Sequence, residues 1–197
     1  MTLVSFGAIR APWRLGASGE KYMTKVISLV GKSSSGKTTL LEKIVKELTK
    51  RGYNIGTIKH DTHGFEIDYP GKDSYRHFQA GSQMTMILGP DKIALVKRLA
   101  QPLDLGQALK VFFASRHHKL DLIITEGFKR EHKPKIEIVR QAISTKPICR
   151  NIGDNLSALV SDMKIKDYTV PQFGLNETRK IAAFIEEKFI CQAKRIK

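Results

Sequence analysis

The chain is poor in cysteine and in long apolar runs, and each shortage excludes a class of protein. Its 197 residues include two cysteines, Cys149 and Cys191, which are far apart and form no C-x-x-C pair. This usage argues against a disulfide scaffold and favours free thiols in a reducing compartment, so we expect a cytoplasmic protein. No apolar run approaches the roughly 20 residues that a membrane-spanning helix needs, so we expect no membrane partner.

Acidic residues are also scarce. Aspartate and glutamate number 19 against 34 lysines and arginines, which gives a formal net charge of +15. Such an excess is compatible with nucleic acid, with acidic small ligands or with an acidic protein partner. The lysines are scattered through the chain, which is typical of a solvated basic surface and does not favour specific binding to nucleic acid.

The first 22 residues differ from the rest of the chain. They contain three glycines, one proline and the only tryptophan, with no sustained periodicity. They lack the apolar core and the cleavage site of a signal peptide. We therefore predict that residues 1–22 are a disordered extension, with Met23 as the alternative natural start, and that residues 23–197 form a single domain. A targeting segment is the functional alternative for the extension.

A complete phosphate-binding loop motif follows. Residues 31–38 read Gly-Lys-Ser-Ser-Ser-Gly-Lys-Thr and match G-x-x-x-x-G-K-[ST]. In this motif the loop amides cradle phosphates, the lysine (Lys37) reaches the β- and γ-phosphates, and the hydroxyl (Thr38) binds Mg²⁺. The predicted nucleotide-binding residues are Gly31, Lys32, Ser33, Ser34, Ser35, Gly36, Lys37, Thr38 and Thr39.

The context of the loop predicts an α/β fold. The apolar run 25–30 before the loop is typical of a buried parallel strand, and the residues after it recur at helical spacing from Leu40 to Leu48. Further strands are predicted at 53–58, 84–88, 92–96, 120–125, 135–139 and 156–160, and further helices at 74–80, 105–117 and 176–189. Strands that alternate with helices predict a P-loop NTPase fold, with a mainly parallel sheet, helices on both faces and an antiparallel hairpin extension at 84–96.

Two acidic residues are candidates for catalysis and for Mg²⁺. Glu126 ends the predicted buried strand 120–125, where a P-loop protein carries the acid that reaches Mg²⁺ directly or through water. Asp61 follows the strand 53–58 and could hold the same ion or orient a water. We therefore predict Thr38, Glu126 and Asp61 as the metal site, with Glu126 and Asp61 as the catalytic residues.

The loop after the second strand reads Lys59-His60-Asp61-Thr62-His63. Lys59 could neutralise phosphate charge, and the two histidines could contact phosphate or a transition metal. Two histidines in a loop do not make a closed metal site, so both interpretations stay open together with that of ordinary loop residues.

Together these segments resemble the molybdopterin-guanine dinucleotide biosynthesis protein B (MobB) family. The resemblance covers residues 24–189. It is carried by the segments 31–40, 58–60 (Ile-Lys-His), 71–74 (Gly-Lys-Asp-Ser), 80–81 (Ala-Gly) and 125–129 (Thr-Glu-Gly-Phe-Lys). It implies a GTP-binding homodimer with weak Mg²⁺-dependent GTPase activity that assists a MobA-type guanylyltransferase. Whether molybdopterin also binds directly stays open. Thr62 stands where family members often carry another histidine, which weakens a metal role for this loop.

Some interpretations go beyond the family pattern. Lys32 could reach a partner's nucleotide across a dimer, although a solvated lysine is the simpler interpretation. The pair Ser161-Asp162, after the strand 156–160, could accept hydrogen bonds from guanine, or could belong to a turn at the end of the strand. The alternative functions are a P-loop small-molecule kinase, a metallochaperone GTPase and a nucleic-acid-associated NTPase. A kinase would need a lid with arginines over the phosphates, and Arg130 and Arg140 could serve there but are not clustered in the sequence. No arginine finger or defined base is evident, so we expect at most a slow GTPase.

Overall fold

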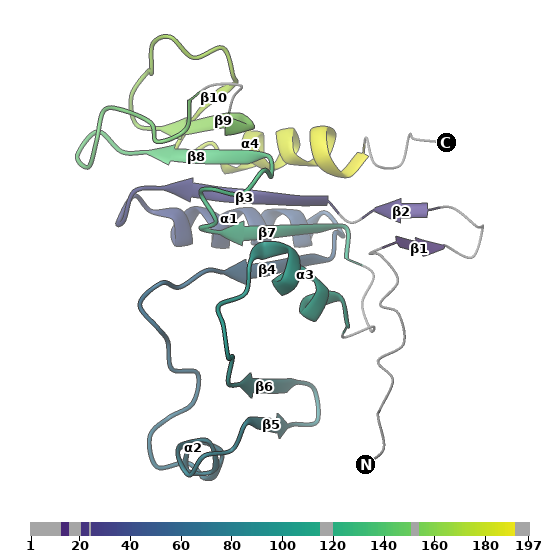
Figure 1. Ribbon diagram of the computed structural model, residues 1–197. Coiled ribbons are helices and arrows are strands. Elements are labelled where there is room, and N and C mark those ends of the chain that lie inside the picture. Colours follow the sequence, from purple (N-terminus) through teal and green to yellow (C-terminus); the bar gives the residue numbers. More distant parts are fainter. Residues whose placement is uncertain (1–12, 16–20, 24, 115–119, 151–153, 192–197) are drawn as a thin grey trace. The chain divides into compact units, whose positions relative to one another are not determined.

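The computed structural model describes residues 13–15, 21–23, 25–114, 120–150 and 154–191. The chain divides into two compact units (Figure 1). The first unit contains the residues up to 60 and those from 113 onward, and the second contains residues 61–112. Among the described residues, no helix combines the length and the apolar composition needed to cross a membrane.

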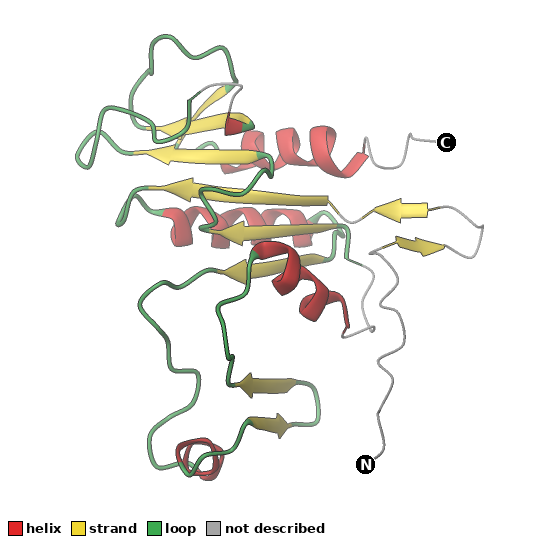
Figure 2. Ribbon diagram, in the orientation of Figure 1, coloured by secondary structure: helices red, strands yellow, loops and turns green. Residues whose placement is uncertain are grey.

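The first unit is built on a six-stranded sheet with the order β10-β9-β8-β3-β7-β4. All five neighbouring pairs are parallel, so the carboxyl ends of the strands lie at one edge (Figure 2). The strands are β3 (Lys25–Gly31), β4 (Ile55–Lys59), β7 (Leu122–Glu126), β8 (Lys135–Val139), β9 (Leu156–Ser161) and β10 (Gln172–Gly174). The strands β7, β8 and β9 are buried along their whole length, as apolar strands of a covered parallel sheet are.

Two helices cover one face of this sheet. Helix α1 (Lys37–Lys50) packs beside α4 (Thr178–Ile185), which continues as the π-helical segment Glu186–Cys191. Their apolar stripes join the alternate residues of β3, β7, β8 and β9 in one core cluster. A smaller cluster forms on the other face and includes loop residues; its buried members are Val30, Val139, Cys149, Leu156, Leu159 and Ile165. Burial of these stripes is the main stabilising contribution to the first unit.

The second unit contains α2 (Asp73–Gln79), the antiparallel pair β5 (Met84–Leu88) and β6 (Ile93–Lys97), and most of α3 (Leu105–Ala114). Gly89 closes the hairpin by donating its N–H to the carbonyl oxygen of Lys92 at 2.9 Å. The turn Gly89-Pro90-Asp91 therefore forms where the sequence predicts it. One face of the pair is apolar and exposed; its residues are Met84, Met86, Leu88, Ile93 and Leu95, between 45% and 71% exposed.

The predicted α/β class, with a mainly parallel sheet and a separate antiparallel hairpin, is confirmed. Strand β10 is missed because three residues are too short for a period-two pattern. The final helix begins at Thr178, two residues after its predicted start at residue 176. The reason is local: the carboxylate of Glu177 accepts the N–H of Gly174 at 2.8 Å, which holds the chain in a turn before the helix.

Other boundaries differ only slightly, except at two places. The predicted helix 105–117 ends at Ala114, and its last residues lie outside the described part. Most of the predicted extension 1–22 also lies outside it; what is described there pairs β1 (Trp13–Leu15) with β2 (Lys21–Met23) in an antiparallel ladder. The disorder of residues 1–22 and the single domain 23–197 stay predictions.

Candidate functional site

The loop between β3 and α1 adopts a backbone that only glycine fits at two positions. Gly31 has a φ of 153°, and a Cβ there would lie 2.6 Å from the carbonyl oxygen of Ile138. Gly36 has a φ of 89° and begins α1 in the left-handed conformation. Ser34 also has a positive φ, 59°, which is strained for a residue with a Cβ. Loops of this kind aim successive N–H groups at one point and can hold an anion.

Lys37 is the first residue of α1, and its side chain turns back to the loop. Its Nζ donates a hydrogen bond to the carbonyl oxygen of Lys32 at 2.8 Å. Burial lowers the pKa of Lys37 from its usual value; Glu126 opposes this shift, and the charges of Lys129 and Lys59 add to it. Three lysines therefore act on one another near a single carboxylate, an arrangement that a polyphosphate would stabilise.

Thr38 and Glu126 meet at the end of β7. The Thr38 hydroxyl lies 3.0 Å from Oε1 and 3.1 Å from Oε2 of Glu126, and donates to that carboxylate. Glu126 is 8% exposed. A hydroxyl and a carboxylate are hard oxygen donors of the kind that Mg²⁺ prefers. This donor set fits Mg²⁺, and it brings together two of the three residues predicted for the metal.

The ends of β4 and β7 are joined beside this pair. Lys59 lies opposite Glu126 in the parallel register, and the N–H of His60 donates to the carbonyl oxygen of Glu126 at 3.0 Å. The ring of His60 stacks on that of Phe128, with centroids 4.5 Å apart and an interplanar angle of 19°. Phe128 holds a φ of 54°, a strained value for an aromatic residue. Strain of this kind is often found at functional sites.

The remaining residues of the Lys59 loop belong to the second unit. There the carboxylate of Asp61 accepts a hydrogen bond from the N–H of His63 at 2.9 Å. The structure therefore places Asp61 within its own loop, and its predicted role in catalysis and at the metal depends on the sequence alone. Within the described ranges, no group of three His, Cys, Asp or Glu side chains is arranged to hold a metal ion.

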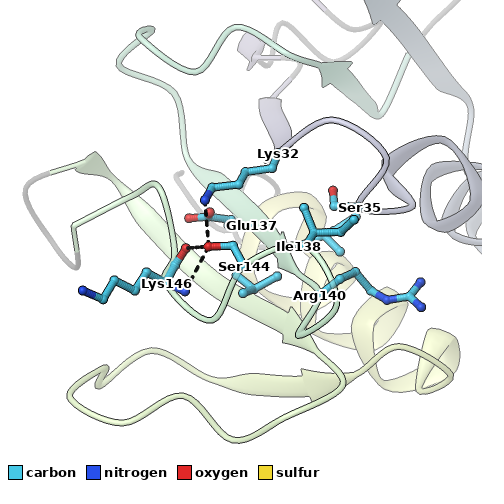
Figure 3. Close-up of a pocket in the computed structure, with 9 residues that line it drawn as sticks. Lys32, Ser35, Glu137, Ile138, Arg140, Ser144 and Lys146 are labelled. Atoms are coloured by element: carbon cyan, nitrogen blue, oxygen red, sulfur yellow. Dashed lines mark hydrogen bonds between the residues drawn. The ribbon is translucent and has the colours of Figure 1, made fainter.

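Lys32 contacts its own chain. Its Nζ donates to the Oγ of Ser144 at 2.7 Å (Figure 3). Ser144 in turn accepts the N–H of Lys146 at 3.2 Å, which fixes the loop after β8. The hypothesis that Lys32 reaches a partner's nucleotide would require this hydrogen bond to break.

A buried carboxylate organises the same loop. Glu137 of β8 is 1% exposed and accepts the N–H groups of Ile148 at 2.6 Å and Cys149 at 2.8 Å. Burial raises the pKa of the Cys149 thiol to about 12, and the neighbouring negative charge of Glu137 adds to the shift. The loop from residue 140 to 150 is thus held to β8 by Glu137 and to the phosphate-binding loop by Lys32.

We expect Cys149 to resist thiol reagents in the folded protein. The thiolate is the reactive form, and a pKa of about 12 leaves only a trace of it at pH 8, with reactivity rising only as the pH approaches that value. A chromogenic disulfide reagent at pH 8 should therefore modify one thiol rapidly, the half-buried Cys191, and a second only after denaturation. Cys191→Ser should remove the rapid reaction. Two rapid thiols in the native protein would contradict the expectation.

Asp162, the candidate for contact with guanine, is engaged by the protein itself. Its carboxylate accepts the N–H of Gln141 at 2.8 Å and the Nε–H of Arg140 at 3.2 Å. The hydrogen bond from Gln141 and the pairing with Arg140 lower the pKa of Asp162. Asp162 is thereby placed to hold the guanidinium of Arg140 beside the phosphate-binding loop, a position for which the sequence carries no local pattern.

Residues 26–162 match the family model MobB, "Molybdopterin guanine dinucleotide synthesis protein B". The "Molybdopterin-guanine dinucleotide biosynthesis adapter protein" of Escherichia coli (strain K12) is 34% identical over 169 residues, 85% of this chain and 94% of that protein. The protein of the same name from Haemophilus influenzae is 35% identical over 162 residues, 82% of this chain and 87% of that protein.

Solved structures of MobB proteins resemble the fold of this chain. The crystal structure of Bacillus subtilis MobB matches with a TM-score of 0.64 and 25% identity, over 81% of this chain and 97% of that one. The MobB protein homolog from Bacillus stearothermophilus matches with a TM-score of 0.60 and 25% identity, over 83% of this chain and 97% of that one. The family match, the relatives and the fold coincide, and the chain belongs to the MobB family.

Proposed function

We propose that this protein is a GTP-binding adapter in the biosynthesis of molybdopterin guanine dinucleotide, with a slow Mg²⁺-dependent GTPase activity. The observation that carries the proposal is the contact of Thr38 with the buried Glu126 at the mouth of a complete phosphate-binding loop. The adapter role is supported by the names of the Escherichia coli and Haemophilus influenzae relatives.

The residues of the site take distinct roles in this proposal. The amides of residues 31–39 hold the phosphates, and Lys37 exchanges its hydrogen bond with the Lys32 carbonyl for phosphate oxygens. Thr38 and Glu126 would hold Mg²⁺, which neutralises phosphate charge when bound. Asp61 completes the metal or water shell in the sequence-based prediction. The exposed lysines 59 and 129 face anionic groups of the nucleotide, of molybdopterin or of a partner.

The side chains at the site are consistent with slow hydrolysis of GTP. Glu126 is the candidate for orienting the attacking water, but its carboxylate already accepts the Thr38 hydroxyl. The positive charges that act on Lys37 beside Glu126 are those of Lys129 and Lys59, whereas fast GTPases add an arginine that stabilises the transition state. A missing stabiliser of this kind costs about 2.7–4 kcal/mol in the barrier. A partner that supplies one would accelerate the reaction.

The proposed partners are a MobA-type guanylyltransferase and a second copy of the chain, in the cytoplasm. The exposed apolar face of β5 and β6 supports an association of this kind, because monomers rarely expose a contiguous apolar patch. A two-stranded hairpin is also marginally stable by itself, and a covered face would stabilise it.

The test is a calorimetric titration with GTP and with ATP, each with and without Mg²⁺, on the wild type and on Glu126→Gln. The glutamine keeps the shape of the side chain and removes its charge. We expect the wild type to prefer GTP and to bind it more tightly with Mg²⁺ than without. In the variant, the factor by which Mg²⁺ increases GTP affinity should be about tenfold smaller, a difference of about 1.4 kcal/mol.

The titrations test the Mg²⁺ role of Glu126 and the preference for GTP independently. A variant that keeps the full Mg²⁺ gain would remove Glu126 from the metal site. Equal or tighter binding of ATP by the wild type would overturn the GTP-dependent role and would favour a small-molecule kinase. Glu131→Gln is a matched control, since this glutamate lies in the loop after β7 and the side-chain contacts of the site do not include it.

A further inference from the structure

A pocket of about 300 Å³ opens beside the start of α1. It is lined by Ser35 and Gly36 of the loop, by Thr39 of α1, by Arg140 after β8, and by Leu175 and Asn176 after β10. In the sheet, β8 and β10 lie on one side of β3, and β7 with Glu126 lies on the other. The pocket and the Thr38–Glu126 pair therefore flank the phosphate-binding loop on opposite sides.

Two side chains show that this pocket is built for a polar ligand. Ser35 is 1% exposed, and its Oγ has no hydrogen-bond partner among the described residues although it lines the pocket. The Nη1 of Arg140 lies 3.8 Å from the position that a Cβ would take at Gly36. Figure 3 shows the Arg140 side chain pointing away from Lys32 and Ser144, and its Nε is held by Asp162 at 3.2 Å. The guanidinium is therefore fixed in place beside the loop.

The lining has a definite chemical character. Arg140 and Lys43 supply positive charge, Leu40 and Leu175 supply apolar surface, and Asn176 supplies an amide with both a donor and an acceptor. No carboxylate is among the described residues that line it. A volume near 300 Å³ is at the lower end for small-molecule sites. A flat aromatic ring with polar edges fits a planar guanidinium, an aliphatic wall and an amide.

The direction of a bound nucleotide follows from the two sides of the loop. In the proposed function the terminal phosphate would lie toward the proposed Mg²⁺ site at Thr38 and Glu126, so the other end of the nucleotide would leave the loop toward β8 and β10. We propose that this pocket binds the purine nucleoside part of the nucleotide, with the guanidinium of Arg140 against the base and the amide of Asn176 at its edge. The assignment rests on the proposed function, because it requires phosphates on the loop.

The test compares GTP with inorganic triphosphate, which occupies the loop but carries no nucleoside. Calorimetric titrations with Mg²⁺ use the full chain, Arg140→Ala, and the control Arg179→Ala, an exposed arginine on α4 outside the pocket. We expect the wild type to bind GTP more tightly than triphosphate. We expect Arg140→Ala to weaken GTP about tenfold, to leave triphosphate unchanged, and to melt within about 2 °C of the wild type. Arg179→Ala should change neither ligand.

Two results would overturn the assignment. Equal weakening of GTP and triphosphate in Arg140→Ala would make Arg140 a phosphate ligand. Equal affinity of the wild type for GTP and triphosphate would show that no nucleoside is held. Failure of the proposed function is distinct from both, because the wild type would then bind neither GTP nor triphosphate.

Discussion

GTP binding is expected to fall at least about 100-fold when Lys37 is replaced by alanine, which corresponds to a loss of about 2.7 kcal/mol. The ammonium of Lys37 lies over the phosphate-binding loop, where it donates to the Lys32 carbonyl at 2.8 Å. A hydrogen bond between charged groups contributes about 1.5–3 kcal/mol, and the lysine has donors for more than one phosphate oxygen. Calorimetric titration with GTP and Mg²⁺ measures the loss directly.

The fold should survive this substitution. Lys37 is the first residue of α1, and alanine is a strong helix former. The substitution also relieves the repulsion that Lys129 and Lys59 exert on Lys37, so the thermal midpoint should not fall. Lys46→Ala is the matched control: it removes an exposed lysine of the same helix that lies outside the phosphate-binding loop, and we expect less than about a threefold change in affinity. A Lys37→Ala protein that binds GTP like this control would exclude the loop as the phosphate site.

The parts of the fold that the sequence predicted are those with strong local patterns. The strand 25–30, the loop and the following helix are encoded by adjacent residues whose spacing admits one arrangement, and they are found as β3, the loop and α1. The hairpin was predicted because Gly89-Pro90-Asp91 dictates a turn between two apolar runs. Strand β10 carries no such pattern and forms because β9 offers it an edge with which to pair.

The candidate site also has parts that could be predicted from the sequence and parts that could not. The partnership of Thr38 with Glu126 could be predicted, since parallel strands end at one edge and a P-loop protein carries an acid there. The place of Arg140 could not, because it depends on β8 lying next to β3, a pairing between segments far apart in the sequence. The stacking of His60 on Phe128 could not be predicted from the sequence either, because Phe128 adopts a positive φ that phenylalanine rarely has.

Gly31→Ala is expected to have the largest effect on stability, a loss of about 2–4 kcal/mol in the free energy of unfolding. A Cβ at this position would lie 2.6 Å from the carbonyl oxygen of Ile138 and 2.8 Å from the Oγ of Ser35. The first contact is to backbone, and Gly31 faces Ile138 in the register of β3 with β8. Relief of the clash therefore requires two central strands to separate at the point where the loop begins. Urea unfolding followed by far-ultraviolet circular dichroism measures the loss.

Gly52→Ala separates the clash from the backbone strain. Gly52 has a φ of 88°, and a Cβ there would meet no atom within 4 Å. The substitution Gly52→Ala should therefore lower the free energy of unfolding only by the cost of the left-handed conformation, about 1 kcal/mol. The two variants have the same change in composition, so the difference between their unfolding free energies, about 1–3 kcal/mol, reports the contact with Ile138 and Ser35. Equal unfolding midpoints for Gly31→Ala and Gly52→Ala would mean that the loop and β8 can move apart without cost, and the tight junction between β3, the loop and β8 would not be needed to hold the site.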